Sequence, residues 1–189
     1  MYKTVGRQIF KKEWKFLKML DRVPRNISIN TPRCIISNLT PRDIEDVILI
    51  YIDEISRKYL GGALDENKAR EKVLNLLNNH AKVYAIKEKE NDSLLGILYL
   101  NIYYDEKNIE LSYEFKSNYF GMGYAYESIM SFLHYLEQNG IQVLVAETQK
   151  KNINSIKLLK KLGFVKMKEL VRFGEKQIVY KKQFDTIEL

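Results

Sequence analysis

Two glycines separated by one residue, Gly121 and Gly123, mark the stretch of the sequence best suited to hold a charged ligand. Because glycine has no Cβ atom, a ligand can approach the backbone closely there. Residues 109–115 before them alternate apolar and polar side chains, as a half-buried strand does, and residues 124–138 after them have helical apolar spacing. The glycines therefore join a strand to a helix whose first amide N–H groups lack partners within the helix. Such amides and the positive end of the helix dipole favour a phosphate or pyrophosphate, although a plain tight turn would use the same glycines.

The elements that must position this turn follow from the periodicity of the apolar residues along the chain. Predicted strands cover residues 33–39, 82–87, 94–103, 109–115, 142–148, 165–171 and 177–181. Predicted helices cover residues 40–58, 65–79, 124–138 and 152–162. Short turns join the three strands before the glycine turn, which implies an antiparallel meander, and Gly96 within it predicts a bulge or a close approach of two backbones.

The length of 189 residues and the hydrophobic share of 46% suit one compact domain with a full core. We expect this domain to cover residues 32–189, after an N-terminal extension over residues 1–31. Within the extension, residues 7–20 have the pattern of a basic amphipathic helix and residues 21–31 that of an irregular linker. Such a helix can bind a membrane or RNA, but packing on its own domain or on a partner subunit is the commoner use.

The sequence has 31 Lys and Arg against 24 Asp and Glu, a net charge of +7. A basic surface can meet nucleic acid, an acidic membrane or a polyanionic cofactor, and because the charges are spread along the chain, they do not choose among these partners. The single cysteine, Cys34, excludes an intramolecular disulfide and favours a reducing compartment. Without a membrane-spanning apolar run or a signal-peptide pattern, the sequence predicts a cytoplasmic protein. Two histidines and one cysteine form no zinc-ligand cluster, so we expect no metal.

In its order of elements and in two local motifs, the sequence resembles the GNAT superfamily of acetyl-CoA-dependent N-acetyltransferases. In that family a strand leads into the motif Gln/Arg-x-x-Gly-x-Gly/Ala, whose backbone amides bind the pyrophosphate of CoA. The corresponding residues here are Asn118-Tyr-Phe-Gly121-Met-Gly123, which match both glycines but have asparagine at the first place.

The second motif lies about thirty residues further on, where the family has Asn-x-x-Ser followed by a helix that ends in Leu-Gly-Phe. This chain has Asn152-Ile-Asn-Ser155 and then Leu162-Gly-Phe164. The resemblance covers roughly residues 32–183 and is nearest to the RimJ/RimL-like branch, typified by the Rim ribosomal-protein acetyltransferases. That branch often has an acidic-apolar-x-Tyr/Trp pattern before the turn, as Glu110-Leu-Ser-Tyr113 has here.

The resemblance implies an α+β fold, the GNAT acyl-CoA N-acyltransferase fold, with a central mixed, mostly antiparallel sheet flanked by helices. It also implies a splayed gap between the strands over 109–115 and 142–148, in which backbone groups near Phe115 and Lys116 would hold the pantetheine. The residues expected to bind acetyl-CoA are Phe115, Lys116, Asn118, Gly121, Met122, Gly123, Tyr124, Ala125, Asn152 and Ser155.

Two residues are expected to act in catalysis by the same resemblance. Glu110 lies on the strand where some family members keep a carboxylate base, and the interpretation as a solvated strand glutamate without a catalytic role has equal weight. Ser155 falls where related enzymes place a hydroxyl near the leaving sulfur, and its alternative role is helix capping. Many members have a tyrosine acid at the position of Leu159, so Ser155 or water is the better candidate for the acid here.

The predicted function is transfer of the acetyl group of acetyl-CoA to a primary amine, by direct attack in a ternary complex. The acceptor can be a protein N-terminus or a small amine, and a homodimer is a further expectation, whereas nucleic acid and membrane partners are not expected. Two alternatives stay open, namely a basic RNA- or ribosome-associated binding module and a catalytically degenerate CoA-binding member of the family. Four tyrosines could line an acceptor groove, although packing explains them first: Tyr103, Tyr104, Tyr113 and Tyr126.

Overall fold

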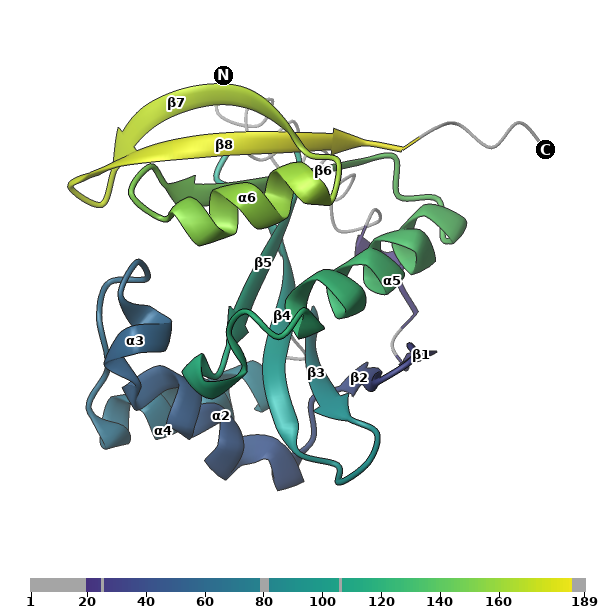
Figure 1. The fold of residues 1–189 in the computed structure, drawn as a ribbon, viewed down its shortest axis with the longest axis vertical. Helices are drawn as coiled ribbons and strands as arrows, with labels where there is room; N and C mark the ends of the chain where they lie inside the picture. The colour runs from purple at the N-terminus through teal and green to yellow at the C-terminus, as the bar shows by residue number, and fades with distance from the viewer. Residues whose placement is uncertain (1–19, 25, 79–81, 106, 185–189) are drawn as a thin grey trace, which may run out of the picture.

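One mixed sheet of eight strands forms the centre of the fold, in the order β1-β2-β3-β4-β5-β6-β8-β7. We describe it from a computed structural model, in which residues 20–24, 26–78, 82–105 and 107–184 are described. The strands are β1 (Ser28–Asn30), β2 (Cys34–Asn38), β3 (Lys82–Glu88), β4 (Leu94–Ile102), β5 (Ile109–Phe115), β6 (Val143–Gln149), β7 (Val165–Arg172) and β8 (Glu175–Gln183). The helical segments are η1 (Pro41–Asp43), α2 (Ile44–Ile52), α3 (Glu54–Arg57), α4 (Glu66–Asn78), η2 (Ser117–Tyr119), α5 (Tyr124–Gln138) and α6 (Ile153–Lys161) (Figure 1). The predicted α+β fold with a mostly antiparallel sheet is confirmed.

The sheet changes character between β5 and β6, the one parallel pair among the described strands. Their pairing consists of Ile109 with Leu144 and Glu110 with Val145. Beyond these residues the two strands diverge, so that β6, β7 and β8 form an upper wing of the sheet in Figure 1. We refer to this divergence as the fork. Glu110 lies at its apex, in the last pair before the strands separate.

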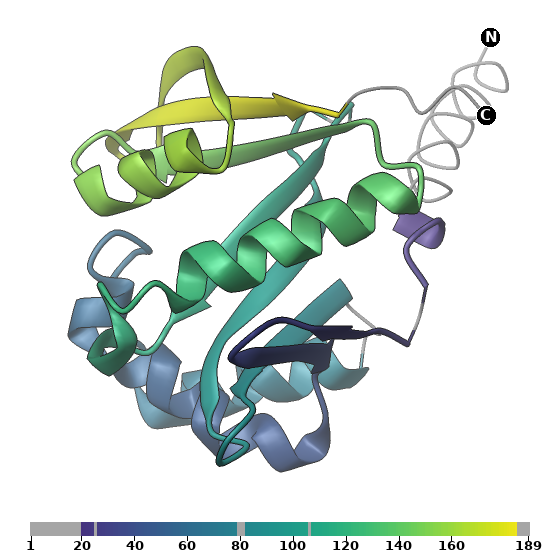
Figure 2. The ribbon, with the colours of Figure 1, turned by 45° about the vertical axis from the view of Figure 1, so that its right-hand side comes forward.

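Helices cover the two faces of the sheet separately. On one face, α5 crosses the central strands and α6 lies beside β6 (Figure 2). Phe132 of α5 and Leu159 of α6 are buried there against alternate residues of the strands. On the other face, Tyr51 of α2 and Val73 of α4 are buried against the intervening residues of β3 and β4. The two faces of the sheet therefore carry different helices, α5 and α6 on one side and α2 and α4 on the other.

The elements that flank the glycine turn are as predicted, because β5 and α5 cover residues 109–115 and 124–138. The antiparallel meander of β3, β4 and β5 is also confirmed. At Gly96, an added Cβ atom would lie 2.6 Å from the carbonyl oxygen of Glu114 and 2.7 Å from Cδ1 of Phe115, so the predicted close approach is real. The helix predicted over residues 40–58 is wrong in one respect, since it breaks at Asp53. The Asp53 backbone is extended, and its carboxylate accepts a hydrogen bond from the Ile55 amide, which starts α3 as a separate helix.

The prediction of an irregular linker over residues 21–31 is wrong for its last part. Residues 28–30 form β1, which pairs antiparallel with β2 at the edge of the sheet. Val23 and Ile27 are buried in the same core as α5. The described part of the extension therefore packs with the domain, whereas the amphipathic helix predicted for residues 7–20 lies almost wholly outside the described residues. The domain boundary at residue 31 stays a prediction.

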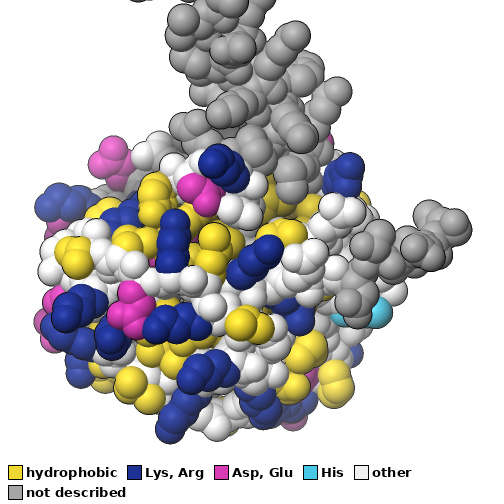
Figure 3. All heavy atoms as spheres, turned by 90° about the horizontal axis from the view of Figure 1, so that it is seen from above, with side chains coloured by type: hydrophobic (Ala, Val, Ile, Leu, Met, Phe, Trp, Pro, Cys, Tyr) yellow, Lys and Arg dark blue, Asp and Glu magenta, His cyan; other side chains and the backbone are white. Residues whose placement is uncertain are grey.

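The positive charge is concentrated in the C-terminal wing, contrary to the even spread expected from the sequence. Residues 150–183 contain eleven Lys or Arg and two Glu, an excess of nine positive charges, whereas the whole chain has an excess of seven. The face over β7 and β8 accordingly shows Lys and Arg side chains among apolar ones, with few acidic ones (Figure 3). Among the described helices, none is long and apolar enough to cross a membrane.

Candidate active site

The glycine turn has the backbone geometry that only glycine adopts readily. Gly121 and Gly123 have φ angles of +76° and +86°, in the left-handed region, and Gly123 is the residue before α5. A Cβ atom added to Gly121 would meet nothing within 4 Å, so the space above it is open. Within the described part of the chain, the amides of Tyr124 and Ala125 donate to no protein acceptor. The turn thus presents unpaired N–H groups at a helix N-terminus, which fits a pyrophosphate.

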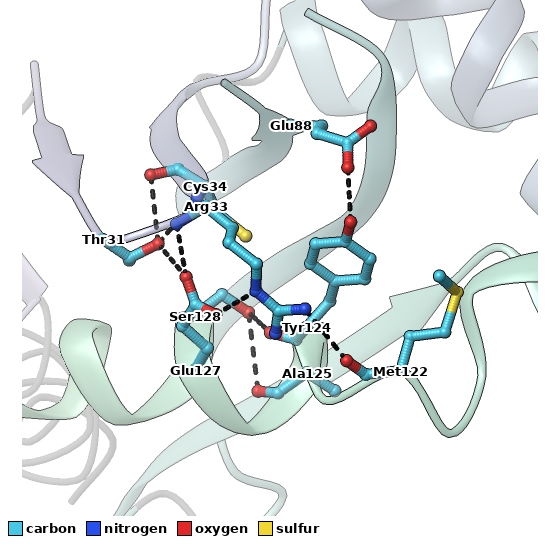
Figure 4. A network of polar contacts seen from close by, with 9 residues as sticks. All are labelled: Thr31, Arg33, Cys34, Glu88, Met122, Tyr124, Ala125, Glu127 and Ser128. Carbon is cyan, nitrogen blue, oxygen red and sulfur yellow. Dashed lines mark hydrogen bonds and ion pairs between the residues drawn. The ribbon is translucent and has the colours of Figure 1, made fainter. Parts of the chain in front are cut away.

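A polar network from the β1–β2 loop holds this turn (Figure 4). The Glu127 carboxylate, in the first turn of α5, accepts hydrogen bonds from the Thr31 hydroxyl at 2.6 Å and from the Arg33 amide and Nε, both at 2.7 Å. Arg33 also donates to the Met122 carbonyl at 3.1 Å, and its guanidinium lies 4.3 Å from the centre of the Tyr124 ring. Sequence reasoning missed Arg33, which is about ninety residues away from its partners. Its role in the network is to fix the turn, since Glu127 balances its charge.

Along β5, alternate residues turn their main-chain groups toward β4 or toward β6. The Lys116 amide donates to the Leu95 carbonyl at 2.9 Å, so Lys116 turns its main chain to β4. By this alternation, Tyr113 and Phe115 turn theirs toward β6, beyond the short β5–β6 pairing. Phe115 can therefore meet an extended ligand in the fork, whereas the Lys116 amide is already used. Asn118 lies exposed in η2, between β5 and the turn.

On the face covered by α5 and α6, Tyr113 and Ser155 meet at the fork. Their hydroxyl groups share a hydrogen bond of 2.8 Å. Asn152 caps α6, because its side-chain oxygen accepts a hydrogen bond from the Ser155 amide at 3.1 Å. Burial raises the pKa of Tyr113 to about 12, so its hydroxyl stays protonated at neutral pH. Leu159 is buried in the same core and has no proton to give.

On the opposite face, Glu110 is a half-buried carboxylate at the apex of the fork. Within the described residues, no hydrogen-bond donor or cation contacts its carboxylate. Burial and the nearby charge of Glu147 raise the pKa of Glu110 to about 7, and Arg172 opposes this rise. A carboxylate with this pKa is half deprotonated at neutral pH and can take up a proton there.

Glu147 differs from Glu110 because its charge is compensated. The Tyr103 hydroxyl donates to the Glu147 carboxylate at 2.6 Å, and Arg172 pairs with the same oxygen at 3.2 Å. Sequence reasoning missed Glu147 and Arg172, although an acidic residue within the apolar run of β6 was a signal that something had to pair with it. Tyr103 and Tyr104 lie on this face and Tyr113 and Tyr126 on the other, so the four tyrosines do not line one groove.

A third carboxylate of β5, Glu114, is bound to Arg57 at 2.8 Å, and both side chains are at most one-tenth exposed. Arg57 also donates to the carbonyl oxygens of Leu60 and Gly62, at 2.7 and 2.8 Å. This pair ties the α3–α4 loop to β5 and leaves Glu110 as the unpaired carboxylate of the strand. Among the described residues, no group of three or more His, Cys, Asp or Glu side chains is arranged to hold a metal ion.

Comparison with known proteins identifies the family of the chain. Residues 33–165 match the family model of the acetyltransferase (GNAT) domain. The chain is 27% identical to the "Uncharacterized N-acetyltransferase YnaD" of Bacillus subtilis (strain 168) over 137 residues. The aligned region covers 71% of this chain and 81% of that protein. A GNAT-family acetyltransferase structure from Bacillus anthracis has a TM-score of 0.75 and 22% identity, over 83% of this chain and 98% of that one. The ribosomal-protein-S5-alanine acetyltransferase of Vibrio fischeri has a TM-score of 0.66 and 17% identity, over 83% and 96% of the two chains. At these identities the two structures show the fold alone.

Proposed function

The chain belongs to the acetyltransferase (GNAT) domain family, of the RimJ/RimL type, and is an N-acetyltransferase. We propose that it acetylates a primary amine by direct attack of the amine on acetyl-CoA in a ternary complex. The observation that carries the proposal is the fork, with Glu110 on one face and the pair of Tyr113 and Ser155 on the other. Donor and acceptor can then approach from opposite faces and meet between β5 and β6.

The donor side of the fork fits acetyl-CoA, the acetyl donor that the family implies. The unpaired amides that follow Gly121 suit the pyrophosphate, and the main-chain groups of Phe115 suit the pantetheine. When bound, acetyl-CoA supplies the thioester whose carbonyl carbon the amine attacks. The cofactor-binding residues that we propose are those predicted from the sequence. They are Phe115, Lys116, Asn118, Gly121, Met122, Gly123, Tyr124, Ala125, Asn152 and Ser155. Lys116 would contact the cofactor through its carbonyl or its side chain, because its amide already donates to the Leu95 carbonyl.

The role that we propose for Glu110 is to remove a proton from the acceptor ammonium, directly or through one water molecule. A primary amine has a pKa of about 8 as an α-amine and about 10.4 as a lysine side chain, so it is mostly protonated at neutral pH. Only the neutral amine has the lone pair that forms the new N–C bond. A carboxylate with a pKa of about 7 and no competing partner is suited to this task.

Tyr113 and Ser155 form the proposed acid. The amine nitrogen becomes positively charged when it attacks, and it must lose a second proton, which passes to solvent, to give the amide. When the C–S bond breaks, the CoA sulfur leaves as a thiolate that must take up a proton. The shared hydrogen bond lets the Tyr113 hydroxyl supply a proton through Ser155, and solvent then returns one to the pair. An unpaired, half-buried carboxylate opposite this pair supports an active enzyme rather than a degenerate CoA-binding protein, and the family match favours an enzyme over an RNA-binding module.

Replacing Gly121 by alanine tests the donor site. The new Cβ atom would project into the open space of the turn and strain its φ of +76°, and we expect acetyl-CoA to bind at least about tenfold more weakly, as for loss of one or two charge-assisted hydrogen bonds. Isothermal titration calorimetry with acetyl-CoA measures this change.

Gly174→Ala is the matched control, since Gly174 has a φ of +74° and equally open surroundings but lies in the β7–β8 turn. Both substitutions carry the same backbone strain, of about 1–2 kcal/mol. Equal affinity of the two folded variants for acetyl-CoA would contradict the assignment of the turn as the pyrophosphate site.

A further inference from the structure

The face of the sheet that bears Glu110 continues without interruption onto β7. Glu110 pairs with Val145, and Glu147, two residues further along β6, pairs with Val179, which in turn pairs with Lys168. Residues directly opposite each other in paired strands share a face, as do residues two apart on one strand. Glu110 and Lys168 therefore lie on one surface, separated by three strand spacings of about 4.8 Å and by two residues of about 3.3 Å along the strands, which gives about 16 Å.

Lys168 has a cation that no described carboxylate neutralises. Its Nζ lies 5.5 Å from the centre of the Tyr104 ring, which is half exposed. Lys181, opposite Val145 on β8, also has no carboxylate partner among the described residues and lies on this face, about two strand spacings from Glu110. Arg172 is different, since Glu147 balances its charge. The surface beside Glu110 thus has two uncompensated lysines.

Lys168 and Lys181 belong to the C-terminal wing described above, in which residues 150–183 have eleven basic and two acidic side chains. Both acidic residues are already paired, Glu169 with Lys150 and Lys166, and Glu175 with Lys151. An acceptor with several positive charges would be repelled by this surface. An acceptor with one amine and nearby carboxylates would be attracted, with the amine next to Glu110 and the carboxylates next to Lys181 and Lys168.

We propose that the acceptor is the α-amine of a polypeptide with acidic side chains within its first four residues. The proposal rests on the amine acetylation proposed above and narrows its substrate class. An extended chain advances about 3.3 Å per residue, so the distances of about 10 Å to Lys181 and about 16 Å to Lys168 correspond to three to five residues. The long lysine and acidic side chains bridge part of these distances, which brings both lysines within reach of the first four residues. Polyamines and aminoglycoside-like amines are poor acceptors by the same reasoning, because their additional cations meet Lys168 and Lys181.

The test compares three peptides that begin with the same serine and differ only at positions two to four, which are all Glu, all Gln or all Arg. Arginine replaces lysine in the basic peptide because a lysine side chain is itself an acceptor. The rate at which free CoA thiol is released, at saturating acetyl-CoA, gives kcat/KM for each peptide. Spermidine is assayed in the same way as the polyamine acceptor. We expect the Glu peptide to exceed the Gln peptide by about tenfold and the Gln peptide to exceed the Arg peptide, with ratios that shrink as salt is added.

Two charge reversals decide whether the lysines cause the preference. Lys168→Glu should reduce the preference for the Glu peptide at least about fivefold and raise kcat/KM for the Arg peptide. Lys89→Glu makes the same change of charge in the exposed β3–β4 turn and should leave all ratios unchanged.

The outcomes separate this inference from the proposed function. Equal acetylation of the three peptides, a preference that Lys168→Glu leaves intact, or better acetylation of spermidine would overturn the inference while amine acetylation stands. No acetylation of any of the four amines would overturn the proposed function itself.

Discussion

Glu110→Gln should lower kcat by a factor of about 10² to 10⁴, the usual contribution of a general base, and leave the affinity for acetyl-CoA unchanged. Glutamine has nearly the same size but cannot accept a proton from the amine. For the wild-type enzyme, kcat/KM should rise with pH through about 7, where Glu110 loses its proton, and the variant should lack this limb of the profile. Steady-state kinetics across pH 5.5–8.5 would measure both effects, with Glu90→Gln in the exposed β3–β4 turn as the control.

The same substitution should change stability in the opposite direction to activity. The folded-state pKa of Glu110, about 7, lies above the ordinary value of 4.5, so the folded protein holds this proton more tightly than the unfolded chain does. That contribution to stability is complete below pH 4.5 and is lost as the pH rises through 7. Glu110→Gln should therefore raise the free energy of unfolding at pH 8, by no more than about 3 kcal/mol, and not at pH 4. A variant that is less stable than the wild type at pH 8 would show that Glu110 is a structural residue with a partner.

Arg57→Met should lower the free energy of unfolding by about 3–5 kcal/mol, because it leaves the Glu114 carboxylate buried without its cation. The substitution also leaves the carbonyl oxygens of Leu60 and Gly62 without their donors, so the α3–α4 loop should loosen. Urea denaturation followed by circular dichroism measures the change.

Two further variants separate the buried pair from a general effect of removing arginine. Arg70→Met removes an exposed arginine that also binds a carboxylate, Glu45, through two nitrogens, and it should destabilise the protein far less than Arg57→Met does, because solvent screens this pair. The double variant Arg57→Met/Glu114→Leu should recover at least half of the loss, since no unpaired charge remains. If the double variant is no more stable than Arg57→Met alone, the destabilisation does not come from the stranded Glu114 charge.

Local sequence patterns predicted those elements whose side-chain periodicity extends over several residues. The strand over 109–115 and the helix over 124–138 have such patterns, and their bounds agree with the structure. By contrast, β1 has three residues, too few for a period, and it is a strand only because β2 lies beside it. The break at Asp53 depends on the backbone angle of a single residue, which the apolar spacing on either side does not reveal.

The features of the site likewise fall into those set by neighbouring residues and those set by the tertiary fold. The glycine turn is local, so its free amides follow from the residues next to it. Burial and the charge of Glu147 raise the pKa of Glu110, and Arg172 opposes the rise. Both neighbours come near Glu110 only through the registers of β5, β6, β8 and β7. The meeting of Tyr113 with Ser155 likewise joins residues 42 positions apart, on a strand and a helix that the fork brings together.

The central claim is that Glu110 and the fork support direct attack of an amine on acetyl-CoA, without an acetylated enzyme. The most direct measurement mixes the enzyme with stoichiometric acetyl-CoA, with and without the serine-initiated Glu peptide, and follows free CoA and the mass of the intact protein. We predict CoA release only when the peptide is present, in equal amount to the acetylated peptide, and no change in the mass of the protein. Release of one equivalent of CoA without the peptide, together with a protein that carries an acetyl group, would contradict direct attack.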